Sequence, residues 1–215
     1  MNYQVTYSFK QKLVISNVYS ITNDYFANIL QVYNQRGTFL IPQNMQTITN
    51  NGLSISYPFD FAKWWSASAF INYNYSTYDG NIGDADIKIN IHTANFRIQN
   101  NITLPGKILM DATFAYNTPF VWRGSIRIAE TSQVNLGVKK DFLKGMLQIR
   151  LTASDIFNQS SDYDYHGNYG GLEIAGVRSF DNRRVGAGLT YKFGNQKVRV
   201  NRKKGALEDE LNRLN

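Results

Sequence analysis

The densest group of chemically capable side chains lies in the segment SDYDYHGNYGG, residues 161–171. It places Asp162, Tyr163, Asp164, Tyr165 and His166 in succession. Such acidic and aromatic groups could contact a metal chelate, the face of a sugar or a divalent cation. Their spacing does not match an EF-hand loop, and a solvated, turn-rich surface loop has the same composition. The surface loop is the favoured interpretation, and contact with a ligand is the alternative hypothesis.

A second candidate pair is Trp122 and Arg123. Together they could clamp a ligand between an indole and a guanidinium. The favoured interpretation is a tryptophan of a membrane-interface girdle with a polar anchor beside it, because tryptophan is enriched at such interfaces. Ligand contact by these two residues remains the alternative.

Catalytic chemistry finds little support in the sequence. The two histidines, His92 and His166, have no paired acid at metal-ligand spacing, and no cysteine is present. No nucleophile-elbow, phosphate-loop or zinc-protease motif occurs. We therefore predict that the protein is not an enzyme and has no cofactor.

The elements that must position these residues are strands, because apolar residues alternate with polar ones from end to end. The alternation predicts about nine antiparallel strands, most near ten residues long, which is longer than the strands of most globular sheets. A tilted strand of roughly 9 to 11 residues spans a bilayer. The sequence contains no run of about 18 apolar residues, so it predicts no transmembrane helix. No signal peptide is visible at the N-terminus.

The connections between the strands alternate in length. Short turns are expected at residues 10–12, 58–63, 105–107 and 143–145, and long segments near residues 32–45, 77–88, 118–130 and 158–182. Outer-membrane barrels have short periplasmic turns and long extracellular loops. Residues 13–33 could form one long strand or two strands hinged at 22–24, and the alternation of connection lengths favours one.

The polar face of the predicted strands is built of small uncharged groups. The chain contains 24 asparagines and only 18% charged residues, against roughly 25% charged residues in average soluble domains. A face turned to bulk solvent would carry more lysine and glutamate, whereas neutral groups suit a crowded barrel interior. Aromatic residues also cluster at the strand ends, as in the two girdles of membrane barrels. We predict an all-β, up-and-down transmembrane barrel, with a soluble antiparallel β-sandwich as the alternative.

Three segments resemble the C-terminal barrel strands of TonB-dependent outer-membrane receptors. They are NTPFVWRG (117–124), NLGVKKDFLKGMLQIRLTASDIFN (135–158) and RRVGAGLTYKFG (183–194). The sequence is similar over essentially its whole length to the outer-membrane β-barrel family common in Bacteroidetes-type bacteria. The resemblance implies a barrel of about 22 strands around an N-terminal plug, which takes up scarce nutrients with energy relayed by TonB.

The resemblance also implies an assembly signal. Gly188, Tyr191 and Phe193 match the glycine and aromatic positions of the ending that the barrel-assembly machinery reads, although Gly186 stands where a polar residue is usual and further residues follow. The partners implied are outer-membrane lipid, that machinery, the plug and remaining strands of the receptor, and TonB through the plug. The plug, the TonB-contacting segment and the remaining strands are absent, so we expect a partial barrel that does not insert stably alone.

We expect residues 1–194 to be the C-terminal part of an outer-membrane β-barrel and residues 195–215 to be a basic periplasmic tail. The leucines of the tail have helical spacing, so we expect a short helix in a solvated periplasmic extension rather than a nucleic-acid site. The expected location is the outer membrane with extracellular loops. The first functional hypothesis is uptake of a metal chelate, glycan or peptide, and the second is a structural or adhesive barrel without transport.

Overall fold

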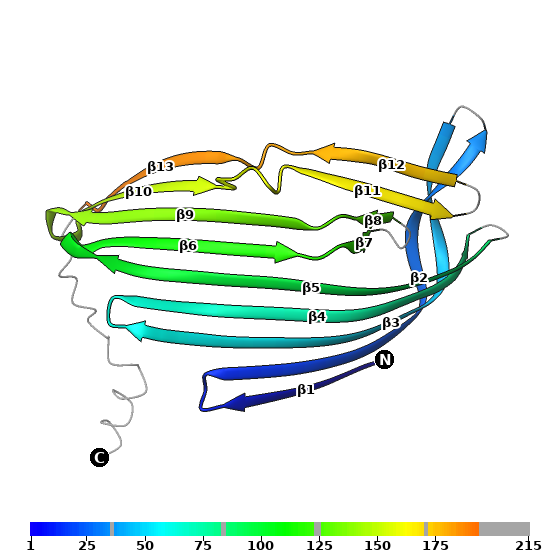
Figure 1. Ribbon diagram of the computed structural model, residues 1–215, viewed down its shortest axis with the longest axis horizontal. Coiled ribbons are helices and arrows are strands. Elements are labelled where there is room, and N and C mark those ends of the chain that lie inside the picture. Colours follow the sequence, from blue (N-terminus) through cyan, green and yellow to red (C-terminus); the bar gives the residue numbers. More distant parts are fainter. Residues whose placement is uncertain (35–36, 83–84, 123–125, 170–171, 194–215) are drawn as a thin grey trace, which may run out of the picture.

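The computed structural model describes residues 1–34, 37–82, 85–122, 126–169 and 172–193. These residues form two antiparallel sheets (Figure 1). The larger sheet has nine strands in the order β1-β2-β3-β4-β5-β6-β9-β10-β13, and the smaller has four in the order β12-β11-β8-β7. The predicted antiparallel, up-and-down strand architecture is therefore confirmed. None of the described segments is a helix long and apolar enough to cross a membrane.

The strands of the nine-stranded sheet differ widely in length. They are β1 (Asn2–Phe9), β2 (Leu13–Asn34), β3 (Gly37–Ala62), β4 (Trp65–Ile82), β5 (Ala85–Leu104), β6 (Ile108–Asn117), β9 (Thr131–Phe142), β10 (Leu147–Ser154) and β13 (Arg184–Tyr191). The second sheet consists of β7 (Phe120–Trp122), β8 (Ile126–Ile128), β11 (Asp162–Tyr169) and β12 (Leu172–Ser179). Because β2 is continuous, the prediction of one strand rather than two over residues 13–33 is confirmed.

The short turns all lie at one end of the nine-stranded sheet (Figure 1). Two of them contain single 3-10 turns, η1 (Pro105–Lys107) and η2 (Leu143–Gly145). Gly106 has a φ of 75° and Gly145 a φ of 90°, values that glycine adopts without steric cost. At the opposite end, β2 with β3 and β4 with β5 run on as long hairpins. The predicted sorting of short and long connections is therefore present, but hydrogen-bonded strands occupy much of the expected loops.

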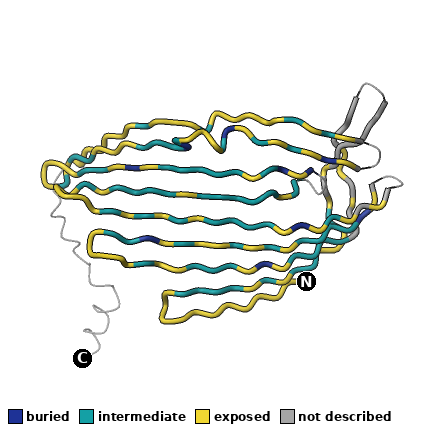
Figure 2. Tube along the Cα trace, viewed as in Figure 1, coloured by how far each residue is buried: buried dark blue, intermediate teal, exposed yellow. Residues whose placement is uncertain are grey.

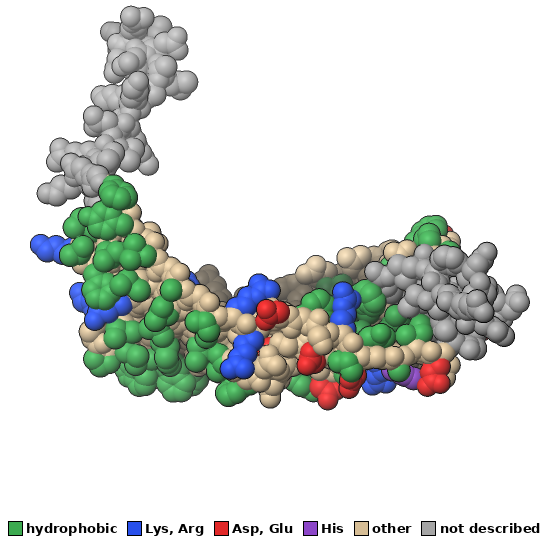
Figure 3. All heavy atoms as spheres, turned by 90° about the horizontal axis from the view of Figure 1, so that it is seen from above, with side chains coloured by type: hydrophobic (Ala, Val, Ile, Leu, Met, Phe, Trp, Pro, Cys, Tyr) green, Lys and Arg blue, Asp and Glu red, His purple; other side chains and the backbone are tan. Residues whose placement is uncertain are grey.

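One face of the nine-stranded sheet is apolar. Residues directly opposite each other in antiparallel strands share a face, and the pairing joins one row of apolar residues across six strands: Tyr7, Ile15, Ile55, Ile71, Phe96 and Tyr116. Figure 3 shows hydrophobic side chains gathered on the convex side of the sheet, in the half that carries the short turns. The convex face is therefore a continuous apolar surface in the half of the sheet that carries the short turns.

The concave face is polar and almost uncharged along the neighbouring row. This row runs across seven strands through Thr6, Ser16, Ser54, Asn72, Asn95, Asn117 and Thr131. Its members bond one another: Asn95 Nδ2 donates to Asn117 Oδ1 at 2.6 Å, and Asn117 Nδ2 donates to Thr131 Oγ1 at 3.0 Å. The row consists of the small neutral polar groups that the sequence predicts for this face.

Glycine makes room for charge on the concave face near the short turns. Gly137 lies opposite Asp111, and a Cβ at Gly137 would stand 2.5 Å from Asp111 Oδ2. The space lets the Asp111 carboxylate lie over β9, where its Oδ1 is 3.6 Å from the guanidinium of Arg150. A larger side chain at residue 137 would displace this carboxylate.

Aromatic side chains form a band at the short-turn end. The rings of Tyr57, Phe59, Phe61, Trp65 and Trp64 follow one another with centroid separations of 4.3 to 5.9 Å. On β9, the ammonium of Lys140 lies 5.2 Å from the Phe142 ring centroid. Such amphipathic groups are typical of a membrane–water interface.

The described residues enclose very little apolar core. Only Ala67, Ile91, Ile126 and Ile128 are buried hydrophobic residues among them, while large apolar side chains of the convex face are exposed (Figure 2). A β-sandwich buries the apolar faces of two sheets against each other. The apolar face of the nine-stranded sheet has no such cover in the described part of the chain, which opposes the soluble sandwich.

The sheet is open. Its two edges are β1 and β13, and no described strand pairs with their outer sides. Backbone groups at an unpaired edge cannot be satisfied in hydrocarbon, so a sheet of this kind needs partner strands on both sides within a membrane.

Candidate functional site

The second sheet continues four strands of the first at the end opposite the short turns (Figure 1). Along the chain, β7 follows β6, β9 follows β8, β11 follows β10, and β13 follows β12. Backbone hydrogen bonds hold the segments that join the two sheets. The N–H of Ile156, between β10 and β11, donates to Val134 O of β9 at 3.0 Å, and Phe180 N–H, after β12, donates to Ser161 O at 2.7 Å. We call β7, β8, β11 and β12 the distal sheet.

The distal sheet is anchored at Asp155, which directly follows β10 and is 0% exposed. Its carboxylate accepts hydrogen bonds from the N–H groups of Gln159 at 3.0 Å and Ser160 at 3.1 Å, and from the hydroxyls of Ser160 at 2.9 Å and Ser161 at 3.3 Å. Its own N–H donates to Asn135 Oδ1 at 2.9 Å. One buried carboxylate thus fixes the turn from β10 into β11.

These contacts set the charge state of Asp155. Burial raises the pKa of this carboxyl, but the hydrogen bonds from Ser160, Gln159 and Ser161 together outweigh burial and lower the pKa below its ordinary value of 3.8. The group is therefore ionised at neutral pH, and its negative charge faces donors only.

A pH dependence follows from this lowered pKa. A carboxylate whose folded pKa is depressed contributes stability above its unfolded pKa, and the contribution is lost as pH falls through the folded pKa. We expect the resistance of β11 and β12 to cleavage by pepsin to be constant from about pH 5 to about pH 4 and to decrease at lower pH. Pulse proteolysis of outer membranes across this range measures the step, and Asp155→Asn should abolish it. A step of equal size in that variant would contradict the assignment.

The candidate ligand-contact residues occupy two faces of the distal sheet. Tyr165 lies opposite Ile128, which lies opposite Phe120, so these residues share a face with Tyr163 and Trp122. His166 lies opposite Arg127, and strand alternation puts Asp162 and Asp164 with it on the other face. The structure therefore separates the aromatic members of the segment from its acidic members. Arg123 lies outside the described residues.

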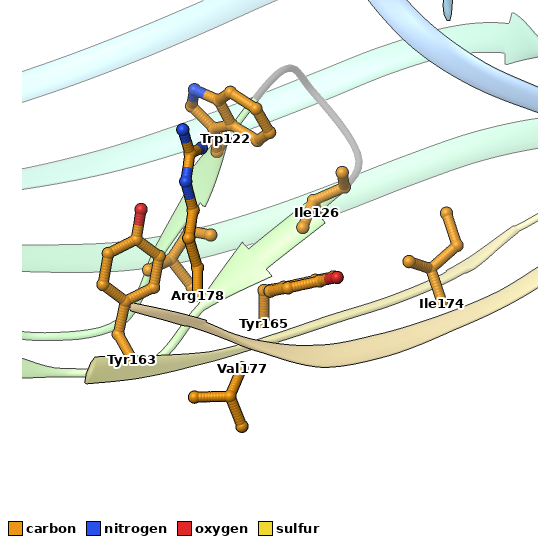
Figure 4. A pocket seen from close by; sticks show the side chains of 8 residues that line it. Trp122, Ile126, Tyr163, Tyr165, Ile174, Val177 and Arg178 are labelled. Carbon is orange, nitrogen blue, oxygen red and sulfur yellow. The ribbon is translucent and has the colours of Figure 1, made fainter. Parts of the chain in front are cut away.

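The aromatic face borders a cavity of about 260 Å³ (Figure 4). Its walls include three aromatic side chains and three isoleucines: Trp122, Tyr163, Tyr165, Ile126, Ile128 and Ile174. The sequence interpretation of Trp122 as a girdle residue differs from this placement. Residues 118 and 119 interrupt the strand between β6 and β7, and the interruption turns the even-numbered side chains of β7 to the concave side.

Arg178 on β12 also lines this cavity and is not among the ligand-contact residues predicted from the sequence. Its guanidinium carbon lies 5.7 Å from the Trp122 ring centroid and 4.7 Å from that of Phe180. Phe180 in turn stacks on Tyr163 with a centroid separation of 5.7 Å. The guanidinium thus lies within cation–π distance of two aromatic rings. The alternation Ile174, Gly176, Arg178 in the sequence could have indicated that these three residues share a face.

Gly176 determines how Tyr165 lies. The two residues are directly opposite each other, and a Cβ at Gly176 would stand 2.6 Å from the Tyr165 hydroxyl oxygen and 2.7 Å from Cζ. The missing side chain lets the tyrosine ring lie flat across β12, as its edge-on outline in Figure 4 shows. The ring therefore offers one of its faces to the cavity.

A second cavity of about 520 Å³ adjoins the first and shares Ile128 and Tyr163 with it. Its lining combines these residues with Arg97 and Asn117, which belong to the concave polar face of the nine-stranded sheet. The aromatic face of the distal sheet and the polar concave face are therefore one surface.

The opposite face of the distal sheet has different chemistry. A cavity of about 300 Å³ there is lined by Tyr165 and by polar or charged side chains, among others: Arg127, Glu130, Asp164 and His166. No group of three or more metal-ligating side chains occurs in the part of the chain that the structure describes. Asp162, Asp164 and His166 thus form no metal centre among the described residues.

His92 is engaged on the convex face. Its Nδ1 is 2.6 Å from the Tyr73 hydroxyl oxygen, and its ring centroid is 4.7 Å from that of Tyr75. These contacts give the imidazole a role in packing the strand pair β4 and β5.

The residues of the proposed assembly signal lie on or beside the edge strand β13. Gly188 is opposite Arg150 and Tyr191 is opposite Leu147. Phe193 is 88% exposed, and its ring meets that of Tyr191 edge to face at 4.7 Å. The tail, residues 195–215, and its expected helix lie outside the described residues.

One of three comparisons with known proteins, the comparison with family models, finds a match, and it agrees with this architecture. No curated protein and no solved structure matches the chain. A family model described as the outer membrane protein beta-barrel family matches residues 1–191. This match covers more than half of the chain and supports an outer-membrane location. The protein is therefore a member of the outer membrane protein beta-barrel family.

Proposed function

We propose that this chain forms part of the barrel wall of a TonB-dependent receptor that takes up a nutrient, such as a metal chelate, a glycan or a peptide, across the outer membrane. In this arrangement the apolar convex face contacts lipid and the polar concave face lines the lumen. The short turns face the periplasm, the distal sheet lies on the extracellular side, and the basic tail is periplasmic. The chain has no catalytic role and binds no nucleic acid.

The observation that carries the proposal is the continuity of the concave surface. The aromatic cavity at Trp122 and Tyr165 opens beside a second cavity at Arg97, and from there the neutral polar rows continue toward the short turns. A barrel that only stabilises the membrane or adheres to surfaces does not need cavities on its inner side. A transporter needs them, because its cargo is captured outside and passes through the lumen.

The proposal also gives the open edges their partners. Strands β1 and β13 would pair with further strands of the same receptor, since an unpaired edge is not tolerated in hydrocarbon. The enclosed plug would contact TonB, so this wall itself would not. The barrel-assembly machinery would read Gly188, Tyr191 and Phe193 at the β13 edge.

Growth on limiting nutrients tests the proposal in the natural host. A strain that lacks this protein and a strain that lacks TonB should share a growth defect on at least one nutrient source, and the double deletion should be no worse on that source. A high concentration of the nutrient should restore growth of the strain that lacks this protein. A defect that persists at high nutrient concentration and is independent of TonB would indicate a structural or adhesive barrel instead.

A further inference from the structure

We infer that the cavity of the distal sheet binds a small organic anion that carries an aromatic ring. In the bound state the ring stacks against Tyr165 and Trp122, and the carboxylate accepts hydrogen bonds from Arg178. This inference rests on the proposed function and deepens it, because it names the chemical class of the cargo at a cavity of the distal sheet, which that proposal puts on the extracellular side.

The stacking surface is built into the backbone. Gly176 leaves space for the Tyr165 ring to lie flat on β12, so one ring face is presented to the cavity. A flat aromatic ring pairs well with another planar ring in an offset-stacked or edge-to-face arrangement. The isoleucines 126, 128 and 174 line the rest of the wall with aliphatic surface. Because the isoleucine side chains offer no hydrogen-bonding group, this aliphatic part of the wall suits an aromatic ring better than a sugar ring with many hydroxyls.

Arg178 provides the anion contact. The aromatic rings of Trp122 and Phe180 lie against its guanidinium, so its N–H groups remain available at the edge of the guanidinium plane. Among the described residues, no ion pair includes Arg178. A guanidinium fixed in this way is preorganised for bidentate bonding to a carboxylate.

The sign of the charge is consistent across both cavities. No aspartate or glutamate of the described residues lines either of them, whereas each contains one arginine, Arg178 in the first and Arg97 in the second. The carboxylates Asp162 and Asp164 belong to the other face of the distal sheet. An anion in these cavities would meet two cations and no like charge, which favours an anionic ligand over a cationic one.

The volume limits the ligand. About 260 Å³ lies just below the usual range of roughly 300 to 1,000 Å³ for ligand pockets. One or two fused rings with a carboxylate match this space, and a larger ligand would have to extend into the cavity at Arg97.

The probe for the test is naphthoate, measured by equilibrium binding to outer-membrane vesicles that contain the complete protein. Naphthamide replaces the carboxylate by a neutral group, and glucuronate keeps the carboxylate on a non-aromatic ring. Naphthoate should bind to wild-type vesicles above the background of vesicles without the protein, and both other compounds should bind more weakly.

The variant Arg178→Gln should weaken naphthoate binding about tenfold or more, because it removes a charge-assisted hydrogen bond to the carboxylate. It should leave naphthamide binding nearly unchanged. Gly176→Val should weaken the binding of both compounds by lifting the Tyr165 ring. The matched control is Arg127→Gln, which removes an arginine from the opposite face of the same sheet and should bind naphthoate as wild type does.

Each other outcome overturns a defined part of the inference. Equal binding of naphthoate and naphthamide would exclude the anion contact, and stronger binding of glucuronate would exclude the aromatic ring. Equal effects of Arg178→Gln and Arg127→Gln would place the site elsewhere. TonB-dependent growth on an unrelated nutrient without naphthoate binding would overturn this inference alone. Naphthoate binding without any TonB-dependent growth would overturn the proposed function and leave the binding site intact.

Discussion

Replacement of Ile98 by arginine is expected to prevent stable assembly of the protein in the outer membrane. Ile98 lies in β5 on the apolar convex face, between Ala69 and Phe114 of the neighbouring strands. From Leu104, where β5 ends, it lies six positions back, or about 20 Å along the strand and about 15 Å along the membrane normal at a tilt near 40°. This is close to the middle of a hydrocarbon layer about 30 Å thick.

An arginine on the lipid face at that depth costs about 2 to 4 kcal/mol. The adjacent residue offers the matched control, because Gln99 is in the same strand and points to the concave polar face between Ser68 and Thr113. Gln99→Arg should therefore assemble nearly as well as the wild type. The measurement is the fraction of protein in the outer membrane that migrates as a folded, heat-modifiable species. Similar losses in both variants would show that the two faces are wrongly assigned.

The sequence was informative about the nine-stranded sheet because its signal is local. Strict alternation between apolar and polar residues marks strands, and the neutral character of rows such as Asn72, Asn95 and Asn117 identifies the face that does not need bulk water. The alternating lengths of the connections placed the short turns at one end. These features can be recognised in the sequence from the order of the strands alone, without knowing which strands pair.

The distal sheet could not be predicted in the same way. The strand β8 has only three residues and pairs with β11 through Tyr165 and His166, far along the chain. Such short, non-local pairing has no periodic signal. For the same reason the sequence of residues 161–171 predicts a loop with one cluster of candidate residues, where the structure has the strand β11 over Asp162–Tyr169. The alternation within SDYDYH itself shows that the tyrosines and the acidic residues lie on opposite faces if the segment is a strand.

The cavity residues that the sequence analysis missed, Arg178 and Gly176, acquire their roles only through pairing. Gly176 becomes a platform for Tyr165 because β11 and β12 are in register there, and Arg178 meets Trp122 across strands distant in sequence. Asp155 had a local signal, since an aspartate followed at short range by Gln159, Ser160 and Ser161 can bond their backbone and side chains. Its complete burial depends on the neighbouring strands.

Replacement of Asp155 by alanine is expected to detach the distal sheet from the nine-stranded sheet while the latter stays folded. The buried carboxylate accepts four hydrogen bonds from Gln159, Ser160 and Ser161. The alanine leaves the Gln159 N–H and both donors of Ser160 without this acceptor, whereas the Ser161 hydroxyl keeps Asn158 Oδ1 at 2.9 Å. A hydrogen bond to a charged group contributes about 1.5 to 3 kcal/mol. We therefore expect the turn after β10 to lose about 3 kcal/mol or more of its stability.

Limited trypsin digestion of outer membranes measures the effect. Wild-type protein should be cut slowly at Arg178, and Asp155→Ala should be cut there at least about tenfold faster, because an opening free energy lower by about 1.4 kcal/mol already raises the open fraction tenfold. Asp155→Asn should lie between the two, since it keeps the shape and loses the charge. The control Asp162→Ala removes an exposed carboxylate from the start of β11 and should resemble the wild type. If Asp155→Ala is cut as slowly as Asp162→Ala, the distal sheet is held by its strand pairing rather than by the buried carboxylate.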